Sequence, residues 1–268
     1  MKNSNKKILL FDIETAPIIA HVWAIWDQNI GLNQIEKDWH ILSWSAKWLK
    51  GSDGVTYGPH NNIMYQDQRK SENIENDKEL LKGIWKLLDE ADIIITQNGK
   101  KFDIKKLNAR FIQNKLKPYS TLEHIDTCQI ARNKFGFTSN KLEYLCEALD
   151  VKRKKLKHKK FPGHELWKQC LKNNKDAWKE MERYNKQDVL ALEEVYLKLE
   201  PWAKKTSKTV FNNGNCNSCN GKLISKGFRY TAKAKYQRYV CKKCGSNYQS
   251  STNLLDKEDR KNIKVSIA

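Results

Sequence analysis

The sequence places carboxylates at several points where they could act together on a metal ion. Asp12 and Glu14 end an apolar segment, residues 8–13, that we expect to form a buried strand. Because side chains alternate along a strand, both carboxylates should lie on one face of the sheet. Two like charges there would repel unless a cation lies between them, and Mg²⁺ and Mn²⁺ prefer oxygen ligands. A solvated pair at a strand end is the simpler interpretation of these two residues alone.

A third carboxylate, Asp103, follows a predicted strand over 92–96 and a QNG turn. It begins a predicted helix that extends to about residue 115. A carboxylate in the first turn of a helix is often only a favourable charge or a cap for the helix end. Asp103 by itself is therefore no evidence for a metal site.

The last group is a tyrosine and an aspartate in a predicted helix over 176–200. Tyr184 and Asp188 are four residues apart, so both side chains project from one face of the helix. The phenol could then reach a water or a phosphate beside a metal that Asp188 binds. The spacing alone is more typical of a core tyrosine and a surface aspartate.

The order of these signals along the chain is more specific than any one of them. The chain resembles the DEDD superfamily of 3′–5′ exonucleases over roughly residues 8–202, in the segments FDIET (11–15), QNGKKFDIKKLNAR (97–110) and YNKQDVLALEEVY (184–196). It is similar to exonuclease-like proteins of phage and bacteria, related to the proofreading domains of family B DNA polymerases. The tyrosine subtype is implied, because Arg183 stands where the histidine subtype would carry a histidine.

This resemblance implies an α/β fold of the ribonuclease H-like type, with a mixed central sheet flanked by helices. It also implies hydrolysis with two Mg²⁺ or Mn²⁺ ions. Asp12 would bridge both metals, and Glu14 and Asp188 would complete the shell of the first. Asp103 would help to hold the second metal, partly through water.

Other positions near the metal ligands have expected roles. Tyr184 would orient or deprotonate the attacking water, and orientation is favoured because an ordinary phenol loses its proton only near pH ~10. Asn98 would brace its loop or contact the terminal nucleotide, next to Gln97, where many relatives carry a histidine. Asp126 precedes an apolar helical stretch and is interpreted as an N-cap, although it could also support the metal site.

Seven cysteines are present, and four of them form two tight pairs. The pairs are Cys216-x-x-Cys219 and Cys241-x-x-Cys244. The N-terminus does not resemble a signal peptide, so we expect a reducing cytoplasm, where such pairs are more often metal ligands than disulfides. Four thiolates in two knuckles form a closed tetrahedral site for one structural Zn²⁺. The remaining cysteines are expected to be buried thiols: Cys128, Cys146 and Cys170.

The cysteine pairs lie beyond a change in composition near residue 205. We therefore predict a ribonuclease H-like exonuclease domain over 1–204, a zinc ribbon over 205–253 with a hairpin around 227–230, and a charged tail over 254–268. Most of the nine tryptophans are expected in the core.

Charge predicts the partner. The chain carries 50 Lys and Arg against 31 Asp and Glu, a net charge of +19, which favours binding to polyanions. No apolar run approaches the ~20 residues of a membrane-spanning helix, so nucleic acid is favoured and no membrane association is expected. In the ribbon, cations are interleaved with aromatics in a pattern that suits phosphate contact and base stacking on a single strand: Arg229, Tyr230, Lys233, Lys235, Tyr236, Arg238 and Tyr239.

Alternatives remain open at this level. Zinc ribbons also dock proteins, so the ribbon could bind a replication or repair partner. A second basic run, over 152–160, could be a solvated loop or a clamp on the substrate backbone. The leading interpretation is a 3′–5′ exonuclease on DNA, with single-stranded 3′ ends favoured. An exoribonuclease, a structure-selective endonuclease and a non-catalytic nucleic-acid-binding adaptor are the alternatives.

Overall fold

The computed structural model describes residues 6–120, 123–154, 156, 160–203, 214–231 and 233–263. The chain divides into two compact units. Unit 1 comprises residues 1–50 and 56–199, and unit 2 comprises residues 51–55 and 200–268. The domain boundary predicted near residue 205 lies outside the described residues.

Unit 1 is built on a six-stranded mixed sheet. The strands, in spatial order, are β5 (Thr56–Tyr57), β4 (Ile41–Lys50), β1 (Ile8–Thr15), β7 (Ile93–Thr96) and β8 (Glu123–Asp126), and β6 (Met64–Asp67) also pairs with β4. Strands β1, β7 and β8 are parallel to one another, while β4 is antiparallel to β1. This is the mixed α/β architecture expected from the sequence.

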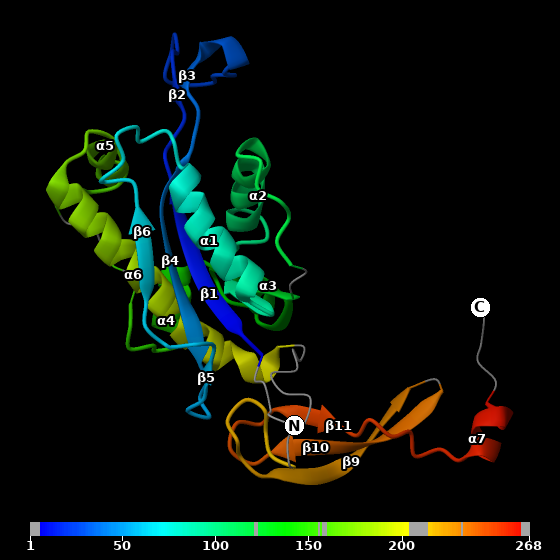
Figure 1. Cartoon of the computed structure of the whole chain (residues 1–268). Helices are drawn as coiled ribbons and strands as arrows, with labels where there is room; N and C mark the ends of the chain where they lie inside the picture. The colour runs from blue at the N-terminus through cyan, green and yellow to red at the C-terminus, as the bar shows by residue number, and fades with distance from the viewer. Residues whose placement is uncertain are drawn as a thin grey trace. The chain divides into compact units, whose positions relative to one another are not determined.

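Helices cover both faces of this sheet (Figure 1). On one face, alternate β1 residues such as Leu9 and Phe11 form a core with α1 (Lys78–Glu90) and α2 (Asp103–Gln113). On the other face, Ile8 and Leu10 pack against the 25-residue helix α6 (Lys175–Leu199). Strand β1 is therefore apolar on both sides, which explains its continuous hydrophobic sequence.

Three shorter helices pack against α6. They are α3 (Thr127–Lys134), α4 (Leu142–Ala148) and α5 (Glu165–Leu171). In the described part of the chain, no helix is both long enough and apolar enough to cross a membrane.

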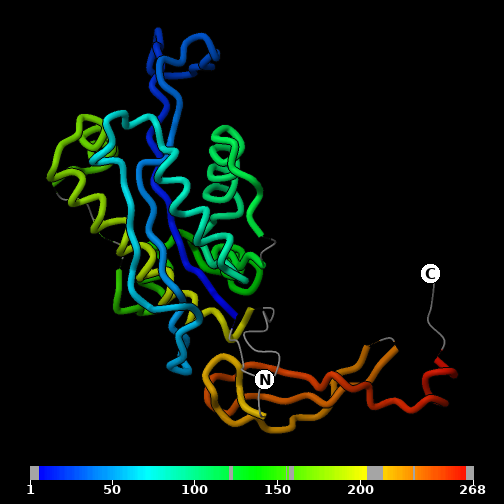
Figure 2. Tube along the Cα trace, in the orientation of Figure 1, coloured from blue at the N-terminus to red at the C-terminus, as the bar shows by residue number. Residues whose placement is uncertain are grey.

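An arm that the sequence patterns did not predict connects β1 to β4. Its two short strands, β2 (Ile19–Ala20) and β3 (Ile35–Lys37), pair with each other, and η1 (Leu32–Gln34) precedes β3. Figure 2 shows the arm extending past the end of the main sheet. Trp23 and Trp26 on this arm are 97% and 81% exposed, and Trp202 of unit 2 is 63% exposed, so the expectation of a core position is wrong for these three tryptophans.

A buried ion pair links α2 to the start of α1 and to β4. Asp77, the residue before α1, is fully buried and accepts hydrogen bonds from Arg110 Nε at 2.8 Å and Nη2 at 2.7 Å. It also accepts the Ile41 N–H at 2.9 Å. One carboxylate therefore fixes three elements on this side of the sheet.

Arg110→Met should lower the free energy of unfolding by about 3–5 kcal/mol, because it leaves the Asp77 charge buried without its partner. Urea denaturation followed by circular dichroism measures this loss. The double variant Arg110→Met/Asp77→Leu should recover part of it, since no unpaired charge then stays in the core. A loss below 1 kcal/mol in the single variant would show that the pair contributes little.

Unit 2 contains an antiparallel three-stranded sheet in the order β11 (Asn247–Gln249), β10 (Ala234–Cys241) and β9 (Leu223–Thr231). The hairpin expected around residues 227–230 lies further along the chain, because β9 runs through these residues and the chain reverses between Thr231 and Ala234. Two short helical segments also belong to unit 2: η2 (Glu200–Trp202) and α7 (Lys257–Asn262), the latter within the predicted charged tail.

Candidate active site

Asp12 and Glu14 lie on the face of β1 that α6 covers. Ile8 and Leu10 pack against Val189, Leu192 and other apolar residues of this helix. Side chains alternate along β1, so the next two even-numbered residues point to the same face. Both carboxylates therefore face the helix that carries Tyr184 and Asp188.

Three of the four predicted carboxylates come together at this point. Asp12, Glu14 and Asp188 each offer one oxygen, and the three oxygens all lie within 4.8 Å of one another. Negative groups this close repel in the absence of positive charge. Hard divalent cations bind such sets of oxygen ligands, so the residues present fit a Mg²⁺ or Mn²⁺ ion.

Asp103 approaches from a different direction. It is the first residue of α2, which packs on the opposite face of the sheet. Strand β7 pairs with β1 only as far as Leu10, and beyond that point the Ile13 N–H donates to Asp103 Oδ1 at 3.2 Å. Burial raises the pKa of the Asp103 carboxyl to about 7. Asp103 is thus outside the group of three but is joined to it through the backbone between Asp12 and Glu14.

Tyr184 lies in an apolar cluster and is only 6% exposed. Its ring packs edge-to-face on Trp167 of α5, with the ring centroids 6.0 Å apart. The Trp167 Nε1–H also donates to Glu14 Oε2 at 3.1 Å. One tryptophan therefore contacts both the tyrosine and a predicted metal ligand. No spacing or motif in the sequence marks Trp167 for this position.

A cavity of about 620 Å³ opens beside the carboxylates. Asp12 and Asp188 form part of its wall, and Asn98 lies there too, so the predicted nucleotide-contacting residue does reach the site. Arg132 and Lys141, which the sequence patterns did not single out, are the cations on this wall. The cavity thus combines a metal-binding edge with positive charge that could meet a phosphate.

The turn that carries Asn98 is held by Asp126. Asn98 has a φ of 63°, a left-handed conformation that asparagine tolerates, and its N–H donates to Asp126 Oδ1 at 2.9 Å. The same carboxylate accepts the Cys128 N–H at 3.0 Å, which confirms the predicted N-cap of α3. The next residue of the turn, Gly99, has to be a glycine, because a Cβ there would lie 2.3 Å from the Thr96 hydroxyl oxygen.

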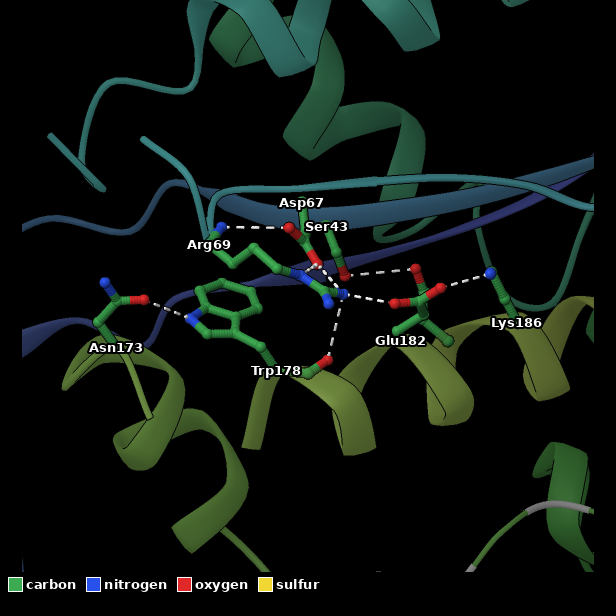
Figure 3. A network of polar contacts seen from close by, with 8 residues as sticks. Ser43, Asp67, Arg69, Asn173, Trp178, Glu182 and Lys186 are labelled. Atoms are coloured by element: carbon green, nitrogen blue, oxygen red, sulfur yellow. Dashed lines mark hydrogen bonds and ion pairs between the residues drawn. The ribbon is translucent and has the colours of Figure 1, made fainter. Parts of the chain in front are cut away.

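A network of ion pairs holds the first half of α6 against the edge strand β6. Arg69 Nε donates to Asp67 Oδ2 at 2.7 Å, and Nη2 donates to Glu182 Oε2 at 2.6 Å. Figure 3 shows Arg69 between these two carboxylates, with Lys186 on the other side of Glu182. Since Tyr184 follows two residues later, this network fixes the part of the helix that forms the site.

The four cysteines predicted to bind zinc come together in unit 2, with their sulfurs all within 4.8 Å of one another. The Sγ atoms of Cys216 and Cys244 are 3.5 Å apart, and those of Cys219 and Cys241 are 3.6 Å apart. A disulfide would require ~2.05 Å, whereas Zn–S bonds of ~2.3 Å in a tetrahedron separate sulfurs by about 3.8 Å. The Tyr248 hydroxyl lies 3.2 Å from Cys216 Sγ. The thiols therefore fit a structural zinc ion.

The predicted nucleic-acid-binding residues of the ribbon are on both faces of its hairpin. Tyr236 of β10 is paired with Arg229 of β9, and the neighbouring Lys235 is paired with Tyr230. Because neighbouring residues in a strand point to opposite faces, these two pairs are on opposite sides of the sheet. The predicted residues therefore do not form one continuous surface.

The other basic positions also have defined surroundings. Lys233 lies in the turn between β9 and β10, and Arg238 Nε donates to the Lys226 carbonyl oxygen at 2.9 Å. Lys235 Nζ lies 4.2 Å from the centre of the Phe228 ring, where a cation is attracted to the ring face. The basic run over 152–160 lies partly outside the described residues.

The mixed sheet, its covering helices and the acidic cluster on its central strand define a ribonuclease H-like protein. Residues 53–200 match the family model of the RNase H superfamily, and the chain belongs to this superfamily. Its fold is also similar to that of the family B DNA polymerase from the hyperthermophilic archaeon Pyrobaculum calidifontis. The TM-score is 0.51 at 15% identity, and the match covers 74% of this chain and 25% of the polymerase chain. No curated protein matches the chain.

Proposed function

We propose that this protein is a metal-dependent nuclease that removes nucleotides from the 3′ end of a strand, with DNA as the favoured substrate. The observation that carries the proposal is the group of three carboxylate oxygens from Asp12, Glu14 and Asp188 within 4.8 Å. Membership of the RNase H superfamily supports it, because this fold usually works with divalent metals. The net charge of +19 favours a polyanionic substrate.

The carboxylates would hold two Mg²⁺ or Mn²⁺ ions. Asp12 would contact both ions, Glu14 and Asp188 would complete the shell of the first, and Asp103 would help to hold the second. When bound, the metals would stabilise the attacking and leaving oxygens of an in-line displacement at phosphorus. The protein's contribution is to fix these ligands in place on β1, α2 and α6.

The proposed role of the tyrosine is to position the attacking water. Tyr184 would hold the attacking water by its hydroxyl group, while the packing of its ring on Trp167 restricts where that hydroxyl can lie. The hydrogen bond from Trp167 to Glu14 would keep the Glu14 carboxylate at a fixed position relative to Tyr184. Positioning of this kind lowers the entropic cost of reaching the transition state.

The cavity next to the carboxylates would receive the end of the strand. Asn98 would contact the terminal nucleotide, and Arg132 and Lys141 would meet the charge of its phosphates. The zinc ribbon, with one structural Zn²⁺, would assist by binding the strand or by docking a replication or repair protein.

A direct assay tests the function. The purified protein is incubated with 5′-labelled single- and double-stranded DNA and RNA, with Mg²⁺, with Mn²⁺ or with a chelator of these metals. We expect a ladder of products shortened from the 3′ end on single-stranded DNA, and its loss with chelator and in Asp12→Ala. Hydrolysis that Asp12→Ala leaves unchanged, or no hydrolysis of any substrate, would overturn the proposal. Internal cuts or a ladder on RNA alone would instead indicate an endonuclease or an exoribonuclease.

A further inference from the structure

Asn185 is a fully buried polar residue that follows Tyr184 in α6. Its Nδ2 donates to Asp12 Oδ2 at 2.7 Å and lies 3.4 Å from the Asp12 carbonyl oxygen. Its Oδ1 accepts a hydrogen bond from the Ser43 hydroxyl at 3.3 Å. The amide thus connects the acidic strand β1 to its neighbour β4, and it uses both of its polar atoms.

The surrounding strands explain why this amide is held in one orientation. Ser43 of β4 is paired with Glu14, and it is fully buried on the same face of the sheet. An amide turned over would present its oxygen to the Asp12 carboxylate, and two acceptors would then face each other. The Asp12 carboxylate needs a donor, so the amide nitrogen faces Asp12 and the amide oxygen accepts the hydrogen bond from Ser43.

An uncharged hydrogen-bond donor is suitable for a carboxylate that binds a metal ion. The hydrogen bond from Asn185 fixes the rotation of the Asp12 carboxylate but adds no charge of its own. A lysine or arginine in this place would neutralise the carboxylate and compete with a divalent cation. Hydrogen bonds to the outer atoms of ligating groups commonly orient those ligands.

A second polar contact between β4 and α6 provides a contrast. Lys47, which is on the same face of β4 as Ser43, forms an ion pair with Glu193 of α6. This pair joins the strand to the helix, and Glu193 also accepts the Lys50 N–H at 2.9 Å. Asn185, by contrast, directs its hydrogen bond from this interface to the Asp12 carboxylate.

We propose that Asn185 is a positioning residue for metal binding, which holds the Asp12 carboxylate in the orientation that a divalent cation needs. The inference deepens the proposed nuclease function and rests on it. Asn185 is not a ligand in this account, and it acts only through Asp12. Its removal should therefore weaken metal binding even where the fold is intact.

Two variants test this role in the full, zinc-loaded chain. Asn185→Ala removes the donor and leaves space, and Asn185→Leu fills the space with apolar atoms. Mn²⁺ affinity is measured from the electron paramagnetic resonance signal of the free ion. We expect binding to weaken by roughly 10–100-fold, as for other residues that orient metal ligands. At saturating Mn²⁺, kcat should fall while KM for the strand changes little.

Leu192→Ala is the matched control, because Leu192 is a buried residue of the same helix and belongs to an apolar cluster. It should lose stability while keeping the wild-type Mn²⁺ affinity. Ser43→Ala provides a second measurement that does not depend on folding of the Asn185 variants. It frees the other end of the amide and should weaken Mn²⁺ binding less than Asn185→Ala does.

Folded Asn185 variants that bind Mn²⁺ as tightly as the wild type would overturn the inference. If neither variant folds, wild-type Mn²⁺ affinity in Ser43→Ala would overturn it instead. Asp188→Asn separates this failure from failure of the nuclease proposal. If the wild type binds Mn²⁺ no better than Asp188→Asn does, then the metal site itself is wrong. If the wild type binds better and the Asn185 variants match it, only the role of Asn185 is wrong.

Discussion

Asp188→Asn should reduce kcat for strand hydrolysis by at least about 1,000-fold, which corresponds to about 4 kcal/mol of transition-state stabilisation. Asp188 supplies one of the three oxygens that lie within 4.8 Å of one another. An amide of the same shape keeps the packing but loses the charge that holds a divalent cation. Single-turnover hydrolysis of a 5′-labelled strand in Mg²⁺ and in Mn²⁺ measures this loss.

The same change should have the opposite effect on the stability of the metal-free protein. Three carboxylates this close repel one another, so removal of one charge should leave the melting temperature unchanged or raise it. Addition of Mn²⁺ should raise the melting temperature of the wild type, because the ion binds only the folded chain, and should raise that of Asp188→Asn much less. A loss of activity with an unchanged or raised melting temperature would identify a functional residue rather than a structural one.

Asp176→Asn is the matched control for this experiment. Asp176 is an exposed aspartate in the first turn of the same helix, paired with Lys160 at 2.6 Å. An exposed pair contributes little to stability, so this variant should keep wild-type hydrolysis and a nearly unchanged melting temperature. Asp188→Asn activity within tenfold of the wild type would contradict the assignment of the carboxylate cluster as the metal site.

Cys216→Ser should remove zinc and unfold the ribbon while unit 1 stays folded. The buried hydrophobic cluster of unit 2 consists of cysteines, and its partly buried hydrophobic neighbours among the described residues are Leu223, Cys244 and Tyr248. So small a core cannot hold a three-stranded sheet without the metal, since a structural zinc commonly contributes ~10–16 kcal/mol to folding. Zinc content by a colorimetric chelator and the amide spectrum of the ribbon strands measure the two losses.

Cys170→Ser provides the control for the cysteine change. Cys170 is a buried thiol of unit 1, far from the zinc ligands in sequence and packed in a separate apolar cluster. This variant should bind one zinc per chain, as we expect of the wild type. Retention of zinc and of the strand signals in Cys216→Ser would show that the four thiols do not form a metal site. Hydrolysis of a short strand should persist in Cys216→Ser, because the carboxylates lie in unit 1.

Local sequence patterns were enough to predict many of the secondary-structure elements and the local placement of the candidate site residues. The apolar runs and their periodicity predicted β1, β7, α1, α2 and α6 to within a few residues, because each of these elements buries a continuous face. Period-2 geometry placed Asp12 and Glu14 on one face of a strand, and the i, i+4 spacing placed Tyr184 and Asp188 on one face of a helix. The paired cysteines predicted a four-thiol cluster for a related reason, since the spacing within each pair suits one knuckle.

Contacts between distant elements required the tertiary structure. Packing of α6 on β1 brought Asp188 to Asp12 and Glu14, while α2 brought Asp103 to the other side of the same strand. Trp167 and Asn185 entered the site through contacts made more than 150 residues apart in sequence, and no local pattern encodes such contacts. The exposed arm was missed because its apolar residues resemble those of a core segment. Only the tertiary structure shows that most of them are exposed. Residue order thus determined which groups the site could contain, and packing determined which of them meet.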